Sequence, residues 1–240
     1  MARVFAVWGL LWFVVTMLLF FIPFLCFSYF HPDPKRNIRF IVMARVWMRV
    51  FLTVAGCPLK VKGTEHFTKG ESCIVICNHN SFMDIPISSP FIPGGNKTIA
   101  KAELAKVPLF GMLYKTGSVL VDRRSDASRK ESYTKMKETL AMGLHMCIYP
   151  EGTRNTSPEP LGPFHDGAFK LAVNTGKAII PAVIFHTRGI LPSKKTFYFW
   201  PHSMAIHFLP PIRPLPNENH SQLKEKAFNQ MKEYYTANNH

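Results

Sequence analysis

The longest uncharged stretch of the chain is the feature that most limits its fold. No Asp, Glu, Lys or Arg occurs from Val4 to Phe30, and the stretch is rich in Phe, Leu, Val and Trp. The part before Pro23 has about 19 residues, which as a helix would measure roughly 28 Å and match the hydrocarbon thickness of a bilayer. A cleaved signal peptide would have a shorter apolar core and small residues at its end, whereas the residues after Pro23 are bulky. We therefore predict a retained membrane segment.

A basic and apolar stretch follows this segment. Arg45 and Arg49 are one helical turn apart, so a helix here would be basic on one side and apolar on the other. That pattern is typical of a helix lying among anionic headgroups. The alternative is a helix packed on the folded domain with its arginines in water. Because only Arg3 precedes the apolar run, the positive-inside rule predicts that everything after Pro34 lies on the cytoplasmic side.

The charge balance of the chain narrows its partners. Lys and Arg number 29 against 15 Asp and Glu, which gives a net charge of +14. Such an excess suits either nucleic acid or an anionic bilayer. The apolar N-terminal run favours the bilayer, so we expect membrane lipid and no nucleic acid as a partner.

The five cysteines show no paired framework, and a cytoplasmic domain would keep them reduced. Cys73, Cys77 and His79 are close enough in the sequence to raise a metal site. No second Cys/His pair occurs at ligand spacing, so we predict buried thiols and no metal.

After Gly63 the pattern changes to short apolar runs that alternate with stretches of helical length. The predicted strands are 72–77, 97–100, 118–121, 145–149 and 178–185, and the predicted helices are 84–89, 109–115, 127–142 and 166–174. One or two further strands within 197–209 and a last helix at 221–235 complete the chain. This alternation predicts an α/β domain (58–240) with a largely parallel sheet flanked by helices, preceded by a membrane-associated two-helix segment (1–57).

The first polar cluster follows the strand predicted at 72–77. It contains His79 and Asp84, which on one continuous helix would point about 140° away from each other. They can meet only if His79 lies in the turn and Asp84 in the first turn of the next helix. The carboxylate would then hold one imidazole nitrogen and leave the other as a base. An ordinary histidine at a helix N-terminus is the alternative. No Gly-x-Ser-x-Gly nucleophile elbow is present, so such a pair would act on a hydroxyl that the substrate brings.

Three basic residues, Lys101, Arg123 and Arg154, lie at the ends of other predicted strands. The carboxyl ends of parallel strands share one edge of a sheet, so these groups are predicted to converge on a phosphorylated substrate. Gly152 permits a tight turn just before Arg154. Taken singly, each basic residue also fits a surface charge in water.

The polar clusters form four ordered stretches: Asn78-His79-x-Ser81-x-x-Asp84, Asp122-Arg123, Pro150-Glu151-Gly152-Thr153-Arg154 and Ile180-Pro181. Their order and spacing resemble the four motifs of the glycerolipid acyltransferase family, over roughly residues 60–190. Within that family the chain is most similar to bacterial 1-acylglycerol-3-phosphate acyltransferases of the PlsC type. The aromatic residue often found before Asp122 is replaced here by Leu120-Val121.

The resemblance implies transfer of an acyl group to the sn-2 hydroxyl of lysophosphatidate, which gives phosphatidate. His79 would deprotonate the hydroxyl and Asp84 would orient His79. Acyl-CoA or acyl-carrier protein would be the acyl donor, and neither a cofactor nor a metal would be needed. The resemblance also implies a bacterial inner membrane, with the catalytic domain on its cytoplasmic side.

The remaining motif residues are implied to bind the substrate. Lys101, Arg123 and Arg154 would hold the phosphate. A backbone donor near Ile180 would meet the developing oxyanion. The other substrate-binding residues of the third motif are Glu151, Gly152 and Thr153.

Three alternatives stay open at this point. The acceptor could be glycerol 3-phosphate or a lyso-aminolipid, because such enzymes share the four motifs. Water could replace the hydroxyl, which would make the protein a thioester hydrolase. The fold could also serve a non-catalytic lipid-binding protein, although the intact His79 and Asp84 argue against this.

Overall fold

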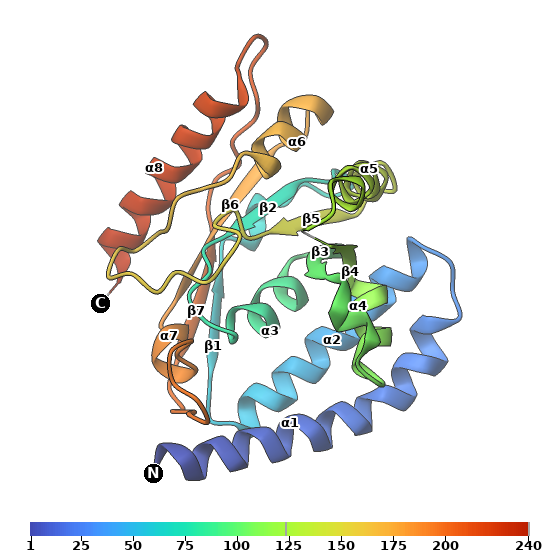
Figure 1. The fold of residues 1–240 in the computed structure, drawn as a ribbon, viewed down its shortest axis with the longest axis vertical. Helices are drawn as coiled ribbons and strands as arrows, with labels where there is room; N and C mark the ends of the chain where they lie inside the picture. Colours follow the sequence, from blue (N-terminus) through green and yellow to red (C-terminus); the bar gives the residue numbers. More distant parts are fainter. Residues whose placement is uncertain (123, 240) are drawn as a thin grey trace.

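The computed structural model describes residues 1–122 and 124–239, and a seven-stranded sheet forms its centre (Figure 1). The strands are β1 (Leu59–Lys62), β2 (Ile74–Cys77), β3 (Asn96–Lys101), β4 (Ser118–Val121), β5 (His145–Ile148), β6 (Ile179–Phe185) and β7 (Met204–Phe208). Their order in the sheet is β1-β7-β6-β2-β5-β3-β4, and each neighbouring pair is parallel except β6 and β7. The predicted α/β class with a largely parallel sheet is confirmed.

Helices cover both faces of the sheet. One face carries α1 (Ala2–Phe24), α2 (Lys35–Val54), α3 (Asp84–Ser88) and α4 (Phe110–Gly117), and the other carries α5 (Asp126–Ala141), α6 (Gly167–Thr175) and α8 (His220–Asn238). The four-residue helix α7 (Thr187–Ile190) follows β6, and shorter helical turns occupy Leu25–Tyr29, Thr64–His66, Ser89–Phe91 and Ala102–Lys106. Successive residues of β2 alternate between the two cores, with Val75 on the α2 side and Ile76 on the α6 side.

Strand β1 was not predicted as a strand. Its four residues alternate, so that Leu59 and Val61 are half-buried whereas Lys60 and Lys62 are exposed. The strand forms an edge of the sheet and pairs only with β7. Two apolar residues are too weak a signal to identify a strand, and lysines on an edge discourage pairing with another chain.

Helices α1 and α2 form a hairpin along one side of the domain (Figure 1). Ala2–Tyr29 is, within the described part of the chain, the one helical segment long and apolar enough to cross a membrane. Two tryptophans link the helices: Trp47 Nε1 donates to Thr16 Oγ1 at 3.0 Å, and Trp8 Nε1 donates to the Val54 carbonyl at 3.1 Å. The outer side of α1 remains exposed and apolar, which indicates membrane association.

The inner side of α2 is part of the domain core. Trp47 and Phe51 belong to the same buried cluster as Val75 of β2. Arg45, predicted to face headgroups, instead donates to the carbonyls of Pro90 at 2.7 Å and Ile92 at 2.8 Å. Helix α2 therefore packs on the folded domain, as in the alternative, but Arg45 is bound to backbone carbonyls and not left in water. Residues 1–57 precede the sheet in the sequence, but in space α2 packs on it.

His145, the first residue of β5, is a buried imidazole held in its neutral form. Its Nδ1 accepts a hydrogen bond from the Cys73 N–H at 3.1 Å, and the edge of the ring faces Phe67. Burial lowers the pKa of His145 to about 4 from its ordinary value of 6.5. The unfolded chain takes up a proton near pH 6.5 whereas the folded chain does not. The stability contributed by neutral His145 is therefore fully present above pH 6.5 and is lost as the pH falls toward 4.

We expect His145→Asn to flatten the acid limb of the stability curve. Wild-type protein should lose roughly 2 kcal/mol through this residue between pH 7 and pH 5, whereas the asparagine does not titrate. Thermal or urea unfolding in detergent at the two pH values measures the difference. His220→Asn, at the start of α8 where the histidine is only half-buried, is the control and should keep the wild-type slope. Equal slopes for wild type and His145→Asn would show that His145 does not couple folding to protons.

Candidate active site

The site begins where β2 ends, because the Asn78 side chain ties the next residues to the sheet. Its Nδ2 donates to the Ile184 carbonyl at 3.0 Å, and its Oδ1 accepts from the Ile184 N–H at 2.7 Å. The amide thus imitates one more strand pair with β6. His79 is therefore the first residue after β2 that has no such pairing with β6 among the described residues.

The carboxylate of Asp84, the first residue of α3, organises the loop that starts at His79. Its Oδ2 accepts from His79 Nδ1 at 2.8 Å and from the backbone N–H groups of Asn80 at 2.6 Å and Ser81 at 2.7 Å. Its Oδ1 accepts from Thr187 Oγ1 at 2.5 Å. The Asp84 side chain is fully buried, and this set of donors replaces its hydration. The predicted geometry, with His79 in the turn and Asp84 in the first helical turn, is confirmed.

Residues at the end of β5 hold His79 from the other side. The ring of Tyr149 stacks on the imidazole with 4.2 Å between the ring centroids, and the Tyr149 hydroxyl lies 2.7 Å from Ser88 Oγ. The Asn155 N–H donates to the His79 carbonyl at 2.7 Å. Burial raises the pKa of Tyr149 well above its ordinary value, so its hydroxyl stays protonated.

Glu151 holds the backbone of the site. Its Oε1 accepts from the His79 N–H and its Oε2 from the Gly162 N–H, both at 2.8 Å. Burial raises the pKa of Glu151, and the two N–H groups oppose this shift. Because both carboxylate oxygens are occupied by the protein backbone, the structure gives Glu151 a positioning role.

The residues after Glu151 in the third motif are less buried than Glu151 itself. Gly152 has φ +68°, and a Cβ atom here would lie 2.9 Å from the His165 ring, so the turn requires glycine. Thr153 is exposed. The Arg154 guanidinium lies over the Phe82 ring at 3.5 Å, and its buried NH1 has no hydrogen-bond partner among the described residues. An unpaired guanidinium nitrogen beside the His79–Asp84 loop can bind an anion such as phosphate.

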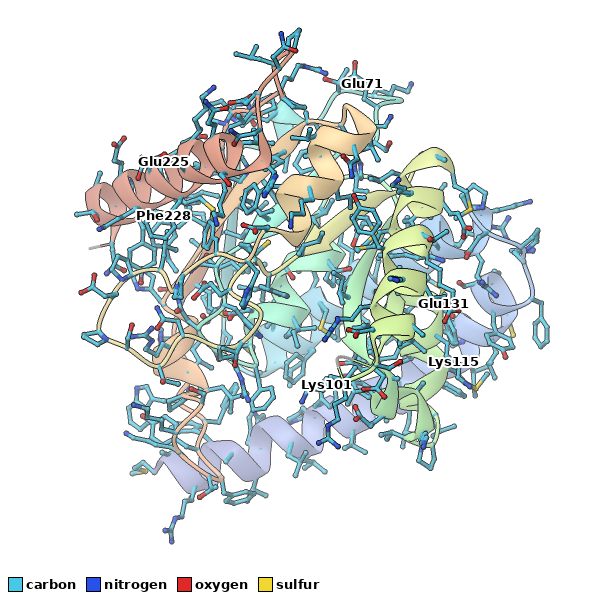
Figure 2. All side chains as sticks on the ribbon, turned by 45° about the horizontal axis from the view of Figure 1, so that its top comes forward. Glu71, Lys101, Lys115, Glu131, Glu225 and Phe228 are labelled. Carbon is cyan, nitrogen blue, oxygen red and sulfur yellow. The ribbon has the colours of Figure 1, made fainter. Side chains whose placement is uncertain are left out.

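The remaining predicted site residues are Lys101, Arg123 and Ile180. Lys101 is exposed at the end of β3, where Figure 2 labels it. Arg123 lies outside the described residues. The structure does not bring Ile180 to the site: its side chain is buried in the core, and its backbone pairs with Val75 inside the sheet. An oxyanion donor at Ile180 is therefore not supported.

Two site residues were missed by the sequence reasoning, Thr187 and Arg188 at the start of α7. Thr187 holds Oδ1 of Asp84 from 103 residues away. Arg188 donates to Asn80 Oδ1 and to the Asn155 carbonyl, both at 3.1 Å, and so joins the loops after β2 and β5. The one sequence signal for Thr187 and Arg188 was their position two and three residues after β6. The carboxyl ends of parallel strands in one sheet lie close together, so residues that follow them can share a site.

The arrangement is that of a general base. Asp84 fixes the Nδ1 side of His79, which leaves Nε2 with a lone pair, and Nε2 has no hydrogen-bond partner within the described part of the chain. The His79 side chain is 14% exposed, so Nε2 can reach a substrate group. The described residues also contain no group of three or more His, Cys, Asp or Glu that could hold a metal ion. This fold and site define an α/β protein in which a hydrogen-bonded His–Asp pair and a nearby arginine lie at the carboxyl edge of a largely parallel sheet.

Comparison with known proteins identifies the family of the chain. The family model described as Acyltransferase matches residues 58–185, just over half of the chain. A Cocos nucifera 1-acyl-sn-glycerol-3-phosphate acyltransferase is 31% identical over 69% of this chain and 53% of its own length. The Homo sapiens 1-acyl-sn-glycerol-3-phosphate acyltransferase alpha is 28% identical over 74% and 62%. This chain thus spans between half and two thirds of the length of these relatives.

A solved structure shares the fold. The crystal structure of the 1-acyl-sn-glycerophosphate (LPA) acyltransferase PlsC of Thermotoga maritima has a TM-score of 0.83 at 22% identity, covering 98% of this chain and 94% of that one. The chain belongs to the acyltransferase family.

We expect Thr187→Val to destabilise the protein, because it leaves Oδ1 of a buried carboxylate without a donor while conserving volume. The cost of such an orphaned group is about 1–3 kcal/mol, which in a chain of this size lowers Tm by roughly 2–4 °C per kcal/mol. Differential scanning fluorimetry in detergent measures the shift. Thr187→Ser keeps the hydroxyl and should stay near the wild-type Tm. A valine variant as stable as the serine variant would contradict the role of this hydrogen bond.

Proposed function

We propose that the protein transfers an acyl group from an acyl thioester to the sn-2 hydroxyl of lysophosphatidate and so produces phosphatidate. The observation that carries the proposal is the His79–Asp84 pair, whose Nε2 is open to the substrate. The names of the similar proteins support the choice of acceptor. The thioester of acyl-CoA or of acyl-carrier protein would be the donor.

The proposed reaction needs one base. His79 Nε2 takes the proton of the substrate hydroxyl while the oxygen attacks the thioester carbonyl carbon. Asp84 stabilises the imidazolium that forms, and the stacked Tyr149 ring keeps it in place. The carbon–sulfur bond then breaks, and the departing thiolate takes the proton back from His79. The products are the ester and the free thiol.

Arg154 supplies the anion site in this proposal. Stacking on Phe82 holds the guanidinium plane beside the catalytic loop, and the unpaired NH1 offers a donor to a phosphate oxygen. Lys101 and Arg123 would add charge from the neighbouring strand ends. A phosphate monoester is favoured over a lyso-aminolipid or over water as acceptor, because neither of those uses this donor.

We infer that the α1–α2 hairpin seats this site on a membrane. Helix α1 contacts the folded domain outside the hairpin, through Phe5 with Trp200 and through Phe13 with Phe110. A helix held along the domain in this way lies parallel to the bilayer surface with its apolar side inserted. The surface would be the cytoplasmic one, because its anionic leaflet attracts the basic residues that follow the apolar run.

The central test is acyl transfer by purified protein, measured with labelled acyl-CoA and a panel of lysolipids, glycerol 3-phosphate and water. We expect His79→Ala to lower the rate with lysophosphatidate by about 10²- to 10⁴-fold, because a positioned base contributes this much. His220→Ala serves as the control and should retain full activity. If His79→Ala keeps more than about a tenth of the rate, the general-base mechanism is wrong.

A second prediction concerns the acceptor phosphate. Arg154→Ala should lower kcat/KM for lysophosphatidate by roughly 30- to 1000-fold, the value of a lost charged contact of about 2–4 kcal/mol. A lysolipid acceptor without a phosphate monoester should be much less affected. Arg213→Ala removes an exposed arginine that pairs with Glu71 and is the matched control. Equal losses on both acceptors would show that Arg154 only supports the loop.

A further inference from the structure

The connection between α7 and β7 carries an unusual surface segment, residues 192–200, which we name the aromatic loop. Its exposed members are Lys194, Lys195, Thr196, Phe197 and Trp200. Phe197 is 53% exposed and Trp200 is 43% exposed. Large aromatic side chains rarely remain in water without a partner, and lysines beside them restrict the choice of partner.

One end of the aromatic loop is attached to the catalytic loop. Ser81 Oγ donates to the Leu191 carbonyl at 2.7 Å, and Ser81 forms an antiparallel bridge with Pro192. Ser81 also donates its N–H to Asp84 Oδ2. A change in the position of residues 191 and 192 is therefore felt directly at the His79–Asp84 pair.

The other end of the aromatic loop is attached to α1. The Phe199 N–H donates to the Ala2 carbonyl at 3.4 Å, and the Phe199 ring covers Gly9, where a Cβ atom would lie 3.4 Å from it. The rings of Phe5 and Trp200 meet edge to face with 5.6 Å between their centroids. In Figure 1 this connection reaches the N-terminal end of α1, so the exposed Phe197 and Trp200 belong to a loop beside a helix with exposed apolar side chains.

The backbone of the aromatic loop is strained at its tip. Phe197 has φ +50°, a conformation that a bulky residue adopts at a cost of about 1–3 kcal/mol. The Phe197 ring is exposed to water, so packing inside the protein does not offset the energy of this backbone strain. The neighbouring Lys195 places Nζ 4.5 Å from the centre of the Tyr198 ring. Rings with adjacent cations are the composition that settles at the headgroup level of an anionic bilayer.

From these observations we infer that the aromatic loop docks on the bilayer next to α1, with Phe197 and Trp200 at headgroup depth and Lys194 and Lys195 on anionic headgroups. Docking would then hold the Ser81 end of the loop, and with it the entrance of the site, against the lipid surface. The statement about the site entrance rests on the proposed function. The statement that the aromatic loop contacts lipid does not depend on acyl transfer.

The test is quenching of a fluorophore by spin-labelled lipids in vesicles of phosphatidylcholine and phosphatidylglycerol. Cys26 is exposed within the apolar segment while the other four cysteines are buried, so the native chain labels at Cys26 and gives the positive control. In a Cys26→Ser background, Phe197→Cys reports the loop. Glu225→Cys reports the outer side of α8, far from α1 in Figure 2, and is the negative control. Thr196→Cys repeats the test with Phe197 retained.

We expect strong quenching at Cys26 and at positions 196 and 197, and none at position 225. Adding Lys194→Glu and Lys195→Glu should reduce quenching at position 196 but not at Cys26, since each lysine near an anionic surface contributes about fivefold to local binding. Quenching at Cys26 without quenching at positions 196 and 197 would overturn the proposal. So would its absence at all sites. Because none of these readouts uses acyl transfer, a failure of the proposed activity would be seen separately.

Discussion

The buried carboxylate of Asp84 is the interaction on which the catalytic end of the molecule depends. A charge removed from water is tolerated only where donors replace its hydration, and Asp84 has four of them. They come from the loop after β2 and from α7 after β6. Satisfying one carboxylate therefore draws two segments together that are about a hundred residues apart, and it sets the orientation of His79 as a by-product.

Residues of the third motif also position His79 through hydrogen bonds and stacking. Glu151 uses its carboxylate on the backbone of His79, and Asn155 donates to the carbonyl of the same residue. Tyr149 closes the stack over the imidazole. The loops that follow β2, β5 and β6 thus form one hydrogen-bonded unit at the carboxyl edge of a parallel sheet, the edge where ligands bind in such folds. Arg154 lies at the border of this unit, and its NH1 has no hydrogen-bond partner among the described residues, which is why we propose it for the substrate phosphate.

Much of the fold could be predicted because most strands are continuous apolar runs bounded by polar turns. The strand predicted at 118–121 matches β4, and the His79–Asp84 pairing followed from helical geometry. Partners distant in the chain could not be predicted. The sequence of a motif does not show whether a side chain contacts the substrate or the protein backbone. Glu151 was expected to bind substrate, but its carboxylate accepts hydrogen bonds from backbone N–H groups. Thr187 carries no local signal, since one hydroxyl after a strand has no periodicity.

The sequence by itself determined the α/β alternation, the apolar segment at Val4–Phe30 and the pairing of His79 with Asp84, because these depend on local periodicity and short spacing. Only the tertiary structure decided what α2 does. Its pattern allowed an interfacial helix or a core helix, and Arg45 binds carbonyls at residues 90 and 92 because sheet packing brings them there. The tertiary structure also placed residues 192–200 between the catalytic loop and α1. Contacts across the fold depend on how layers pack, and local sequence does not encode that packing.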